Sequence, residues 1–233
     1  MISVIIPALN AERTLAASLT ALVPAAIDGI VREVIVVDGG SRDRTSEIAD
    51  IAGADIIHAP TGRGTQLASG AQAARFPWLL FLHADTVLQE GWENEVLSFM
   101  RQIERNDRAD AAGVFKFRLN DRGLKPRLLE AMVRLRCAML ALPYGDQGLL
   151  ISRRLFDEIG GYRDLPIMED IDLVRRIGRR RIAYFDSLAT TSAERYQRDG
   201  YFARSLRNQI CLALYGVGLP ARTIERIYGR AKT

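Results

Sequence analysis

Three short polar segments each follow an apolar, strand-like run, and their residue types suit the binding of a nucleotide or a metal. In an open parallel sheet, ligands bind beyond the carboxyl ends of the strands, so these segments are expected to meet at one edge. Turn glycines and helix caps explain any one of them structurally, but three on one edge point to a site. The candidate residues are Pro7, Ala8, Asn10 and Glu12, then Asp38, Gly39, Gly40 and Ser41, then His83, Ala84 and Asp85.

The second of these segments and a later glycine-bearing loop offer groups for a nucleoside diphosphate. Asp38 ends a strand and precedes two glycines, so its carboxylate can accept hydrogen bonds from a ribose or a base while the backbone approaches closely. The sequence Gly-Arg-Gly at 62–64 precedes a predicted helix. It supplies backbone N–H donors and the cation of Arg63, which suit a diphosphate or a base carbonyl. Alone this second signal is weak, because many loops contain two glycines.

Asp85 is the natural metal ligand among these residues. A diphosphate leaving group needs its developing negative charge neutralised, and Mn²⁺ or Mg²⁺ held by a carboxylate does this. His83 lies two residues earlier, and in an extended segment its side chain points to the same side as that of Asp85. Three interpretations of His83 stay open: a second metal ligand, a donor to phosphate, or a polar residue at a strand end. A histidine ligand favours Mn²⁺ only weakly.

An acidic sequence at 168–173, Met-Glu-Asp-Ile-Asp-Leu, opens a predicted helix and supplies candidate general bases. The helix dipole keeps a carboxylate ionised there, and a general base must be ionised within reach of the acceptor hydroxyl. Glu169 and Asp170 both suit this role, and the residues alone do not rank them. Asp172 stands four residues before Arg176, the spacing of an ordinary ion pair on a helix surface.

A glycine-flanked polar turn, Tyr-Gly-Asp-Gln-Gly at 144–148, precedes another predicted strand. It is either a plain turn or a segment that presents Asp146 and Gln147 to the hydroxyls of a sugar, which favour such planar acceptors and donors.

Alternating strands and helices predict the sheet that positions these groups. The first half reads as a βαβαβαβ series in which Thr45 is expected to cap a helix. This series implies an α/β fold with a mostly parallel sheet and helices on both faces. The predicted strands are 2–6, 33–38, 55–58, 78–83, 112–119, 149–152 and 182–185. The predicted helices are 15–22, 45–52, 65–74, 92–104, 125–141, 153–162 and 168–177, followed by C-terminal helices over 199–231.

The composition is that of an ordinary globular protein, with 233 residues, 48% of them hydrophobic and 26% charged, and a net charge of +4. This length fits one large α/β domain. Cys137 and Cys211 lie far apart in apolar helical runs and form no CxxC pair, which argues against zinc and indicates buried thiols in a reducing compartment. The basic run 174–181 could bind phosphate, lipid headgroups or nucleic acid, but it has no aromatic interleaving and no nucleic-acid motif, so a solvated helix face is favoured and no nucleic-acid partner is expected.

The sequence shows no membrane span and no signal peptide. No apolar stretch reaches the ~18 residues that cross a bilayer, and the N-terminus reads as a strand. The expected location is therefore cytoplasmic, with contact at most peripheral to the inner face of the membrane.

The ordered motifs VIIPALNAERTL, VIVVDGGSRDRT, LLFLHADT, GGY and MEDIDL, between Val4 and Leu173, resemble the family 2 glycosyltransferases of the GT-A fold. The resemblance implies that the segment from Pro7 to Glu12 and Asp38 hold the nucleotide. It implies that Asp85, the last aspartate of a D-x-D motif, holds the metal, and that Asp170 of an "ED" motif is the catalytic base. The implied reaction is inverting: the acceptor hydroxyl attacks the anomeric carbon in line as the nucleotide diphosphate leaves.

The sequence departs from this family pattern at His83, the first position of the D-x-D motif, which puts the usual metal and ribose contacts there in question. FLHADT, YGDQG and ERYQRDGYFARSLRNQ are similar to a bacterial subgroup named for genomic association with radical-SAM and selenodomain proteins and linked to arsenosugar biosynthesis. AERYQRDG lacks the tryptophan of the Q-x-x-R-W motif of processive members, which favours single transfers. By family analogy, Arg195 binds the diphosphate or the acceptor.

The sequence therefore predicts one GT-A domain over 1–233, with a nucleotide-binding half (1–110), an acceptor and catalytic half (111–198) and a C-terminal helical appendage (199–233). The donor is expected to be a nucleotide-diphosphate sugar, UDP being the commonest carrier in the family, and the cofactor Mn²⁺ or Mg²⁺. The acceptor is an unidentified small molecule or a lipid-linked group at a membrane, which the basic run and the apolar segment 210–219 keep open. The C-terminal helices are candidates for a homodimer interface.

Two alternatives to a glycosyltransferase are weighed. A nucleotidyltransferase would carry a glycine-rich basic loop after its first strand, and PALNAERTL has neither glycine nor lysine. A non-catalytic nucleotide-sugar-binding protein would bind a donor without turnover.

Overall fold

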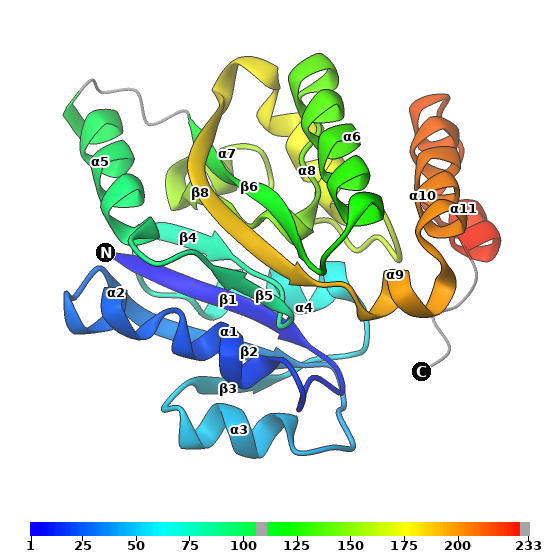
Figure 1. Ribbon diagram of the computed structural model, residues 1–233. Coiled ribbons are helices and arrows are strands. Elements are labelled where there is room, and N and C mark those ends of the chain that lie inside the picture. The colour runs from blue at the N-terminus through cyan, green and yellow to red at the C-terminus, as the bar shows by residue number, and fades with distance from the viewer. Residues whose placement is uncertain (106–110, 229–233) are drawn as a thin grey trace.

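The computed structural model describes residues 1–105 and 111–228 and is built around one eight-stranded sheet. The strands lie side by side in the order β3-β2-β1-β4-β7-β6-β8-β5 (Figure 1). Their bounds are β1 Ile2–Ala8, β2 Val31–Asp38, β3 Asp55–His58, β4 Trp78–Phe81, β5 Thr86–Leu88, β6 Ala112–Asn120, β7 Leu149–Ser152 and β8 Ile182–Ser192.

Strands β1 to β4 are mutually parallel, which confirms the predicted alternating series. Their connections are helical, as parallel neighbours require, because a tight hairpin can join only antiparallel strands. Val4, Ile5 and Ile6 of β1 are fully buried, as expected for a strand covered on both faces. The connecting helices are α1 Leu15–Thr20, α2 Val23–Ile27, α3 Thr45–Ile51 and α4 Arg63–Ala73.

The second half of the sheet mixes directions. Strand β7 is antiparallel to both of its neighbours, β4 and β6, whereas β8 runs parallel to β6. The remaining helices are α5 Trp92–Arg105, α6 Leu124–Leu140, α7 Arg153–Glu158, α8 Glu169–Ile177, α9 Glu194–Asp199, α10 Tyr201–Gly216 and α11 Ala221–Tyr228, with 3-10 turns η1 Gly145–Gln147 and η2 Arg179–Arg181.

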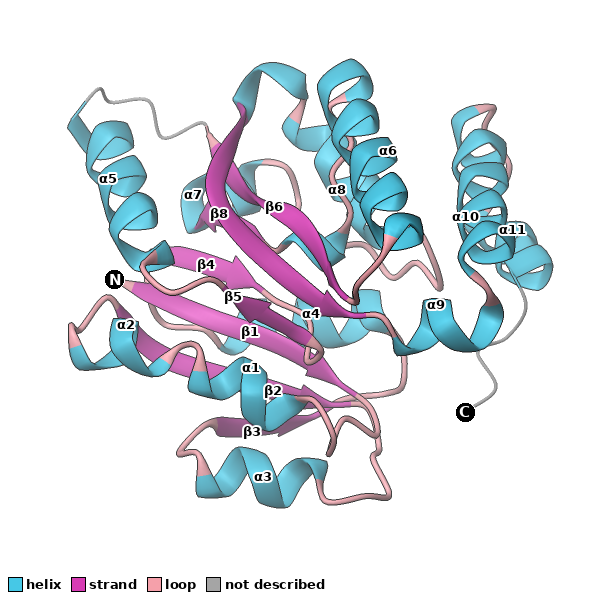
Figure 2. Cartoon of the chain, viewed as in Figure 1, coloured by secondary structure: helices cyan, strands magenta, loops and turns pink. Residues whose placement is uncertain are grey.

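Helices cover both faces of the sheet, as predicted (Figure 2). One core joins Val4 and Ile6 to side chains of α1, α3 and α5, and a second joins Ile5 to side chains of α4, α7 and α8. The split follows from the alternation of side chains along a strand. A further apolar cluster links the start of α8 to α10 and α11 through Ile171, Leu212 and Ile224.

Four local predictions were wrong. Thr45 is the first residue of α3 and makes no cap hydrogen bond; its hydroxyl accepts from the Ala11 N–H instead. Strand β5 was not predicted, and β8 extends from the predicted 182–185 to Ser192. Both strands lack a clear local pattern and are held by distant partners: β5 pairs with β8, and β8 pairs with β6.

The predicted C-terminal helices begin earlier than expected, at Glu194, and break at Gly200, whose φ is +84°. Residues 229–231 of the predicted helical segment lie outside the described part of the chain.

Cys137 and Cys211 are buried free thiols, which confirms the expected burial of the two cysteines. Within residues 1–105 and 111–228, none of the helices is both long and apolar enough to cross a membrane.

Candidate active site

The carboxyl ends of β1 and β2 bring the first two predicted segments together (Figure 1). The Asn10 backbone N–H donates to Ser41 Oγ (2.9 Å), and the Arg42 N–H donates to Asn10 Oδ1 (3.0 Å). Glu12 accepts from the Arg44 N–H at 3.2 Å. Asn10 and Glu12 therefore shape the loop after β2, whereas Pro7 and Ala8 lie inside β1, which is two residues longer than predicted.

Asp38 lies buried at the end of β2, 3% exposed. Its carboxylate accepts from the Ser41 backbone N–H (3.0 Å) and from the Ser41 hydroxyl, and it pairs with His58 Nδ1 at 3.5 Å. Gly39 packs closely on Gln66, because a Cβ there would lie 3.0 Å from the Gln66 amide nitrogen and the amide would have to shift by a few tenths of an ångström. That amide donates to the carbonyls that end β1 and β2. The loop is thus held rigidly against α4.

The sequence predicted that His83 continues β4, and this prediction was wrong. The strand ends at Phe81, and the chain turns so that the Thr86 N–H donates to the His83 carbonyl at 3.1 Å. The extended geometry that would place His83 and Asp85 on one side is therefore absent. Ala84 is buried in this turn, and its carbonyl accepts from the Ser18 hydroxyl.

The imidazole of His83 is uncharged at neutral pH. Burial lowers its pKa well below the usual value, and the nearby cations Arg63 and Arg195 lower it further. A neutral imidazole keeps a lone pair that can bind a metal or accept a hydrogen bond. It supplies no positive charge to a phosphate.

Asp170 is anchored between α8 and η1. Its Oδ2 accepts from the Gly145 N–H and its Oδ1 from the Ile171 N–H, both at 2.8 Å. A Cβ on Gly145 would lie 2.7 Å from His83 Nε2, so the glycine allows His83 and Asp170 to share this loop. Met168, just before α8, has φ of +65°, a left-handed conformation that is unusual for its side chain. Such strain often accompanies functional sites.

Glu169 has a different environment from its neighbour. It is 3% exposed and pairs with Arg63 Nη1 at 3.3 Å. Burial raises the pKa of Glu169, which Arg63 opposes and the Asp170 carboxylate reinforces. Arg63 is the first residue of α4, which begins two residues earlier than predicted. A Cβ at the next residue, Gly64, would lie 2.8 Å from the Arg163 carbonyl, so α4 packs closely on the segment before α8.

Asp146 joins the same acidic centre. Burial raises its pKa to about 6; the guanidinium of Arg136 opposes this shift, and the carboxylates of Asp170 and Asp85 reinforce it. Its Oδ1 is buried and has no hydrogen-bond partner within the described residues. Gln147 instead points inward: its amide donates to the Phe115 carbonyl and accepts from the Tyr144 N–H.

Two residues beside Asp146 were not predicted from the sequence. The Arg136 guanidinium stacks over the Tyr144 ring, 3.4 Å from its centroid. Arg136 Nη2 and the Tyr144 hydroxyl are buried without a hydrogen-bond partner in the described chain. They line a narrow pocket between α6 and α10 together with Asp146, Met132, Val133, Tyr196, Ser205, Asn208 and Gln209. The signal was the position of Arg136 at helical spacing from the buried Leu129 and Val133.

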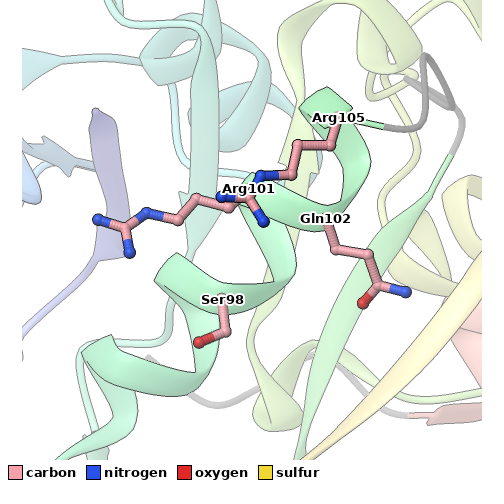
Figure 3. Close-up of a pocket in the computed structure, with 4 residues that line it drawn as sticks. All are labelled: Ser98, Arg101, Gln102 and Arg105. Carbon is pink, nitrogen blue, oxygen red and sulfur yellow. The ribbon is translucent and has the colours of Figure 1, made fainter.

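The remaining predicted residue, Arg195, lies exposed on α9, near enough to His83 to affect its pKa. The structure thus brings together His83, Asp85, Asp146, Glu169, Asp170, Arg63 and Arg195, which interact electrostatically. Among the described residues, a separate hollow on α5 is lined by Ser98, Arg101, Gln102 and Arg105, none of which is a carboxylate or a histidine (Figure 3).

The fit to a divalent metal rests on the donor chemistry at Asp85. Within the described residues, no three His, Cys, Asp or Glu side chains form a complete metal cage. Mg²⁺ in nucleotide sites is commonly held by one or two carboxylates together with substrate phosphates and water. Asp85, with the Asp146 carboxylate nearby, fits that mode of binding and would need the diphosphate to complete it.

Two solved structures share the fold. Glucosyl-3-phosphoglycerate synthase from Mycobacterium tuberculosis, solved with Mn²⁺ and UDP-glucose, matches at 23% identity with a TM-score of 0.62, over 94% of this chain and 80% of that chain. S. aureus TarS, solved with UDP, matches at 19% identity with a TM-score of 0.65, over 97% and 69% of the chains.

Sequence comparison identifies the family. PGL/p-HBAD biosynthesis glycosyltransferases of Mycobacterium bovis and M. tuberculosis are 40% identical over 103 residues, which is 39% of this chain and 37% of theirs. The chain therefore spans little more than a third of the length of these curated relatives. Residues 3–163 match the model of "Glycosyl transferase family 2". Because that match covers well over half of the sequence, the chain belongs to glycosyl transferase family 2.

Proposed function

We propose that this glycosyltransferase moves a sugar from UDP to an acceptor hydroxyl, with inversion at the anomeric carbon. The observation that carries the proposal is that Asp170, on α8, accepts a hydrogen bond from the Gly145 N–H and lies among His83, Asp85 and Asp146. The binding of UDP or UDP-glucose in the similar solved structures supports the choice of nucleotide.

In this proposal the loops after β1 and β2 hold the nucleoside. Asp38 faces the ribose or base from a rigid turn, and the backbone of Gly39 and Ser41 approaches the ligand. Arg63, at the N-terminus of α4, and Arg195 provide positive charge for the diphosphate. Asp85 would hold Mn²⁺ or Mg²⁺, which, when bound, neutralises the charge that develops on the leaving diphosphate.

Asp170 acts as the general base in this proposal. It removes the proton of the acceptor hydroxyl as that oxygen bonds to the anomeric carbon and the bond from that carbon to the diphosphate oxygen breaks. Asp170 suits the role better than Glu169, because Glu169 is buried and paired with Arg63. Backbone N–H donation to both Asp170 oxygens fixes the orientation of the carboxylate.

The acceptor side of the site is the pocket between α6 and α10. Arg136, Tyr144 and Asp146 each place there a buried polar atom that has no hydrogen-bond partner in the described chain. A polar group of the acceptor could form these hydrogen bonds. The same proposal includes the division of the chain into a nucleotide-binding half (1–110), an acceptor and catalytic half (111–198) and a C-terminal helical appendage (199–233). It also includes the narrower likeness to the radical-SAM and selenodomain-associated subgroup.

Calorimetric titration with UDP, GDP, CDP and dTDP, each with Mn²⁺ and with EDTA, tests the donor. We expect UDP to bind most tightly, and only when the metal is present. We expect Asp85→Asn to abolish this metal-dependent binding. Asp50→Asn, on the exposed surface of α3, is the matched control and should bind like the parent. A folded protein that binds no nucleotide would contradict the proposal.

A further inference from the structure

Helices α6 and α10 expose rows of large apolar side chains. The α6 row follows steps of four, four, three and four residues, and the α10 row follows steps of four, four and seven, so each row lies on one helical face. All are at least 45% exposed, and Leu124 and Phe202 reach 89% and 81%. The rows are Leu124, Leu128, Met132, Leu135 and Met139 on α6, and Phe202, Leu206, Ile210 and Val217 along and just after α10.

Both rows face the same side of the molecule. The helices stand side by side and both run upward in the view of Figure 1, α6 after the end of β6 and α10 after α9. Val133 on α6 and Asn208 on α10 both line the pocket. Met132 belongs both to the α6 row and to the pocket lining. At about 100° per residue, the centre of each row lies roughly a quarter turn from the centre of the pocket-lining set of its helix, in opposite senses on the two helices. On parallel helices, opposite rotations bring the two rows to one side.

The charge of this face favours an anionic partner. Of the basic residues on the two helices, Arg127 pairs with Glu130, Arg204 and Arg207 pair with Asp199, and Arg136 is buried beside Tyr144. Lys125 and Arg134 are exposed and flank the α6 row. Two copies of the face would bring like charges together, whereas an anionic bilayer would attract them. Exposed Leu and Phe beside Lys and Arg are typical of helices that lie in a membrane interface.

We propose that this face of α6 and α10, the docking face, binds the surface of a bilayer that contains anionic lipid. Apolar patches of this extent usually mark an interaction surface. The docking itself does not depend on the transferase activity. Its consequence rests on the proposed function: the pocket of Arg136, Tyr144 and Asp146 lies between the same two helices, so docking would bring the acceptor side of the site next to the lipid.

Co-sedimentation of the whole protein with lipid vesicles tests the docking face. We expect binding to vesicles of phosphatidylcholine and phosphatidylglycerol in equal parts, and little binding to phosphatidylcholine alone. The double variant Leu128→Ser, Phe202→Ser should lose about tenfold or more of this binding, because two large apolar contacts are removed. Ile27→Ser, Ile51→Ser is the matched control, since these side chains are 79% and 75% exposed on α2 and α3, and it should bind like the parent. Lys125→Glu, Arg134→Glu should also weaken binding to the mixed vesicles.

Three results would overturn the docking face: a folded parent that ignores both vesicle types, a Leu128→Ser, Phe202→Ser variant that still binds, or a parent dimer that this variant converts to a monomer. The last would show that the face joins two copies. Circular dichroism confirms that each variant is folded. UDP calorimetry on the same samples separates this outcome from a failure of the proposed function, because the variant leaves the donor loops intact.

Discussion

Adjacent carboxylates at the start of α8 differ in what surrounds them. Glu169 is enclosed and paired with Arg63, whereas Asp170 is partly exposed and oriented by two backbone N–H groups. A base must meet its substrate, so exposure and fixed orientation distinguish two residues that their types and spacing alone could not rank.

Replacement of Asp170 by Asn should remove the proposed general base and keep the size and shape of the side chain. We expect transfer to fall by about 100-fold or more while UDP affinity stays within a few-fold of the parent, since the loss falls on the transition state. Single-turnover transfer and calorimetry measure the two effects. Glu169→Gln is the comparison variant and should lose less transfer activity. Equal losses in the two variants would contradict the assignment of Asp170 over Glu169 as the base.

Asp146 should make stability depend on pH. Its pKa in the folded protein is about 6, above the ordinary value of 3.8, so the folded state holds this proton more tightly than the unfolded state does. The stabilising contribution is complete below the ordinary pKa and disappears as the pH rises through about 6. The variant Asp146→Asn does not carry this penalty. The difference in unfolding free energy between variant and parent should therefore be about 1–3 kcal/mol more favourable to the variant at pH 7 than at acid pH.

Urea unfolding of this variant at pH 3.5 and at pH 7 provides the measurement. The exposed Asp50→Asn should show no such difference between the two pH values. An Asp146→Asn effect that is independent of pH would mean that Asp146 titrates normally.

At the scale of elements, α4 carries Arg63 into the site and is positioned by its contact with the sheet. A Cβ on Gly70 would lie 2.4 Å from Ile5 Cγ2 and 2.8 Å from Val37 Cγ2, so only glycine allows the helix this close to β1 and β2. The same approach lets Gln66 bond to the ends of both strands. The spacing between helix and sheet therefore sets the position of the donor loops.

Gly70→Ala tests that spacing. Overpacking of this kind costs about 1–3 kcal/mol, and better helix propensity offsets up to roughly 1 kcal/mol of it. We expect a lower free energy of unfolding and weaker UDP binding, because Arg63 and Gln66 move with α4. Gly216→Ala at the end of α10 is the control, since its Cβ would meet only the tip of Arg175 at 3.6 Å. A fully stable Gly70→Ala protein would disprove the close contact.

At the scale of the whole molecule, the C-terminal helices support the edge of the sheet that carries the candidate site. Met168 and Ile171, on either side of Glu169 and Asp170, are buried against Cys211, Leu212 and Ile224 of α10 and α11. The helical appendage is therefore part of the same core as the start of α8. It also carries half of the docking face.

Ile224→Ala should reveal this coupling. Ile224 is fully buried, and truncation of such a side chain usually costs about 2–5 kcal/mol. We expect a lower free energy of unfolding in urea, one shared transition, and reduced transfer because Ile171 supports Asp170. Val217→Ala, at a site 76% exposed, should leave both quantities unchanged. A separate early transition for α10 and α11 would show that they fold independently of the sheet.

The sequence by itself determined the parallel half of the fold. Strands β1 to β4 and the helices between them follow local periodicity, which a chain carries in neighbouring residues. The rule that ligands bind at the carboxyl ends of parallel strands then directed attention to Asp38 and Asp85 without any coordinates. Their roles, like that of Asp170, stay predictions until the variants are measured.

Tertiary structure decided what depends on residues far apart in the chain. Strand β5 exists because β8 pairs with it, and Asp170 is oriented by the backbone of Gly145, 25 residues earlier. The stacking of Arg136 on Tyr144 and the common side of the α6 and α10 rows likewise follow from packing. Local sequence patterns do not encode such pairings, because each becomes favourable only after the chain has closed the loop that separates its partners.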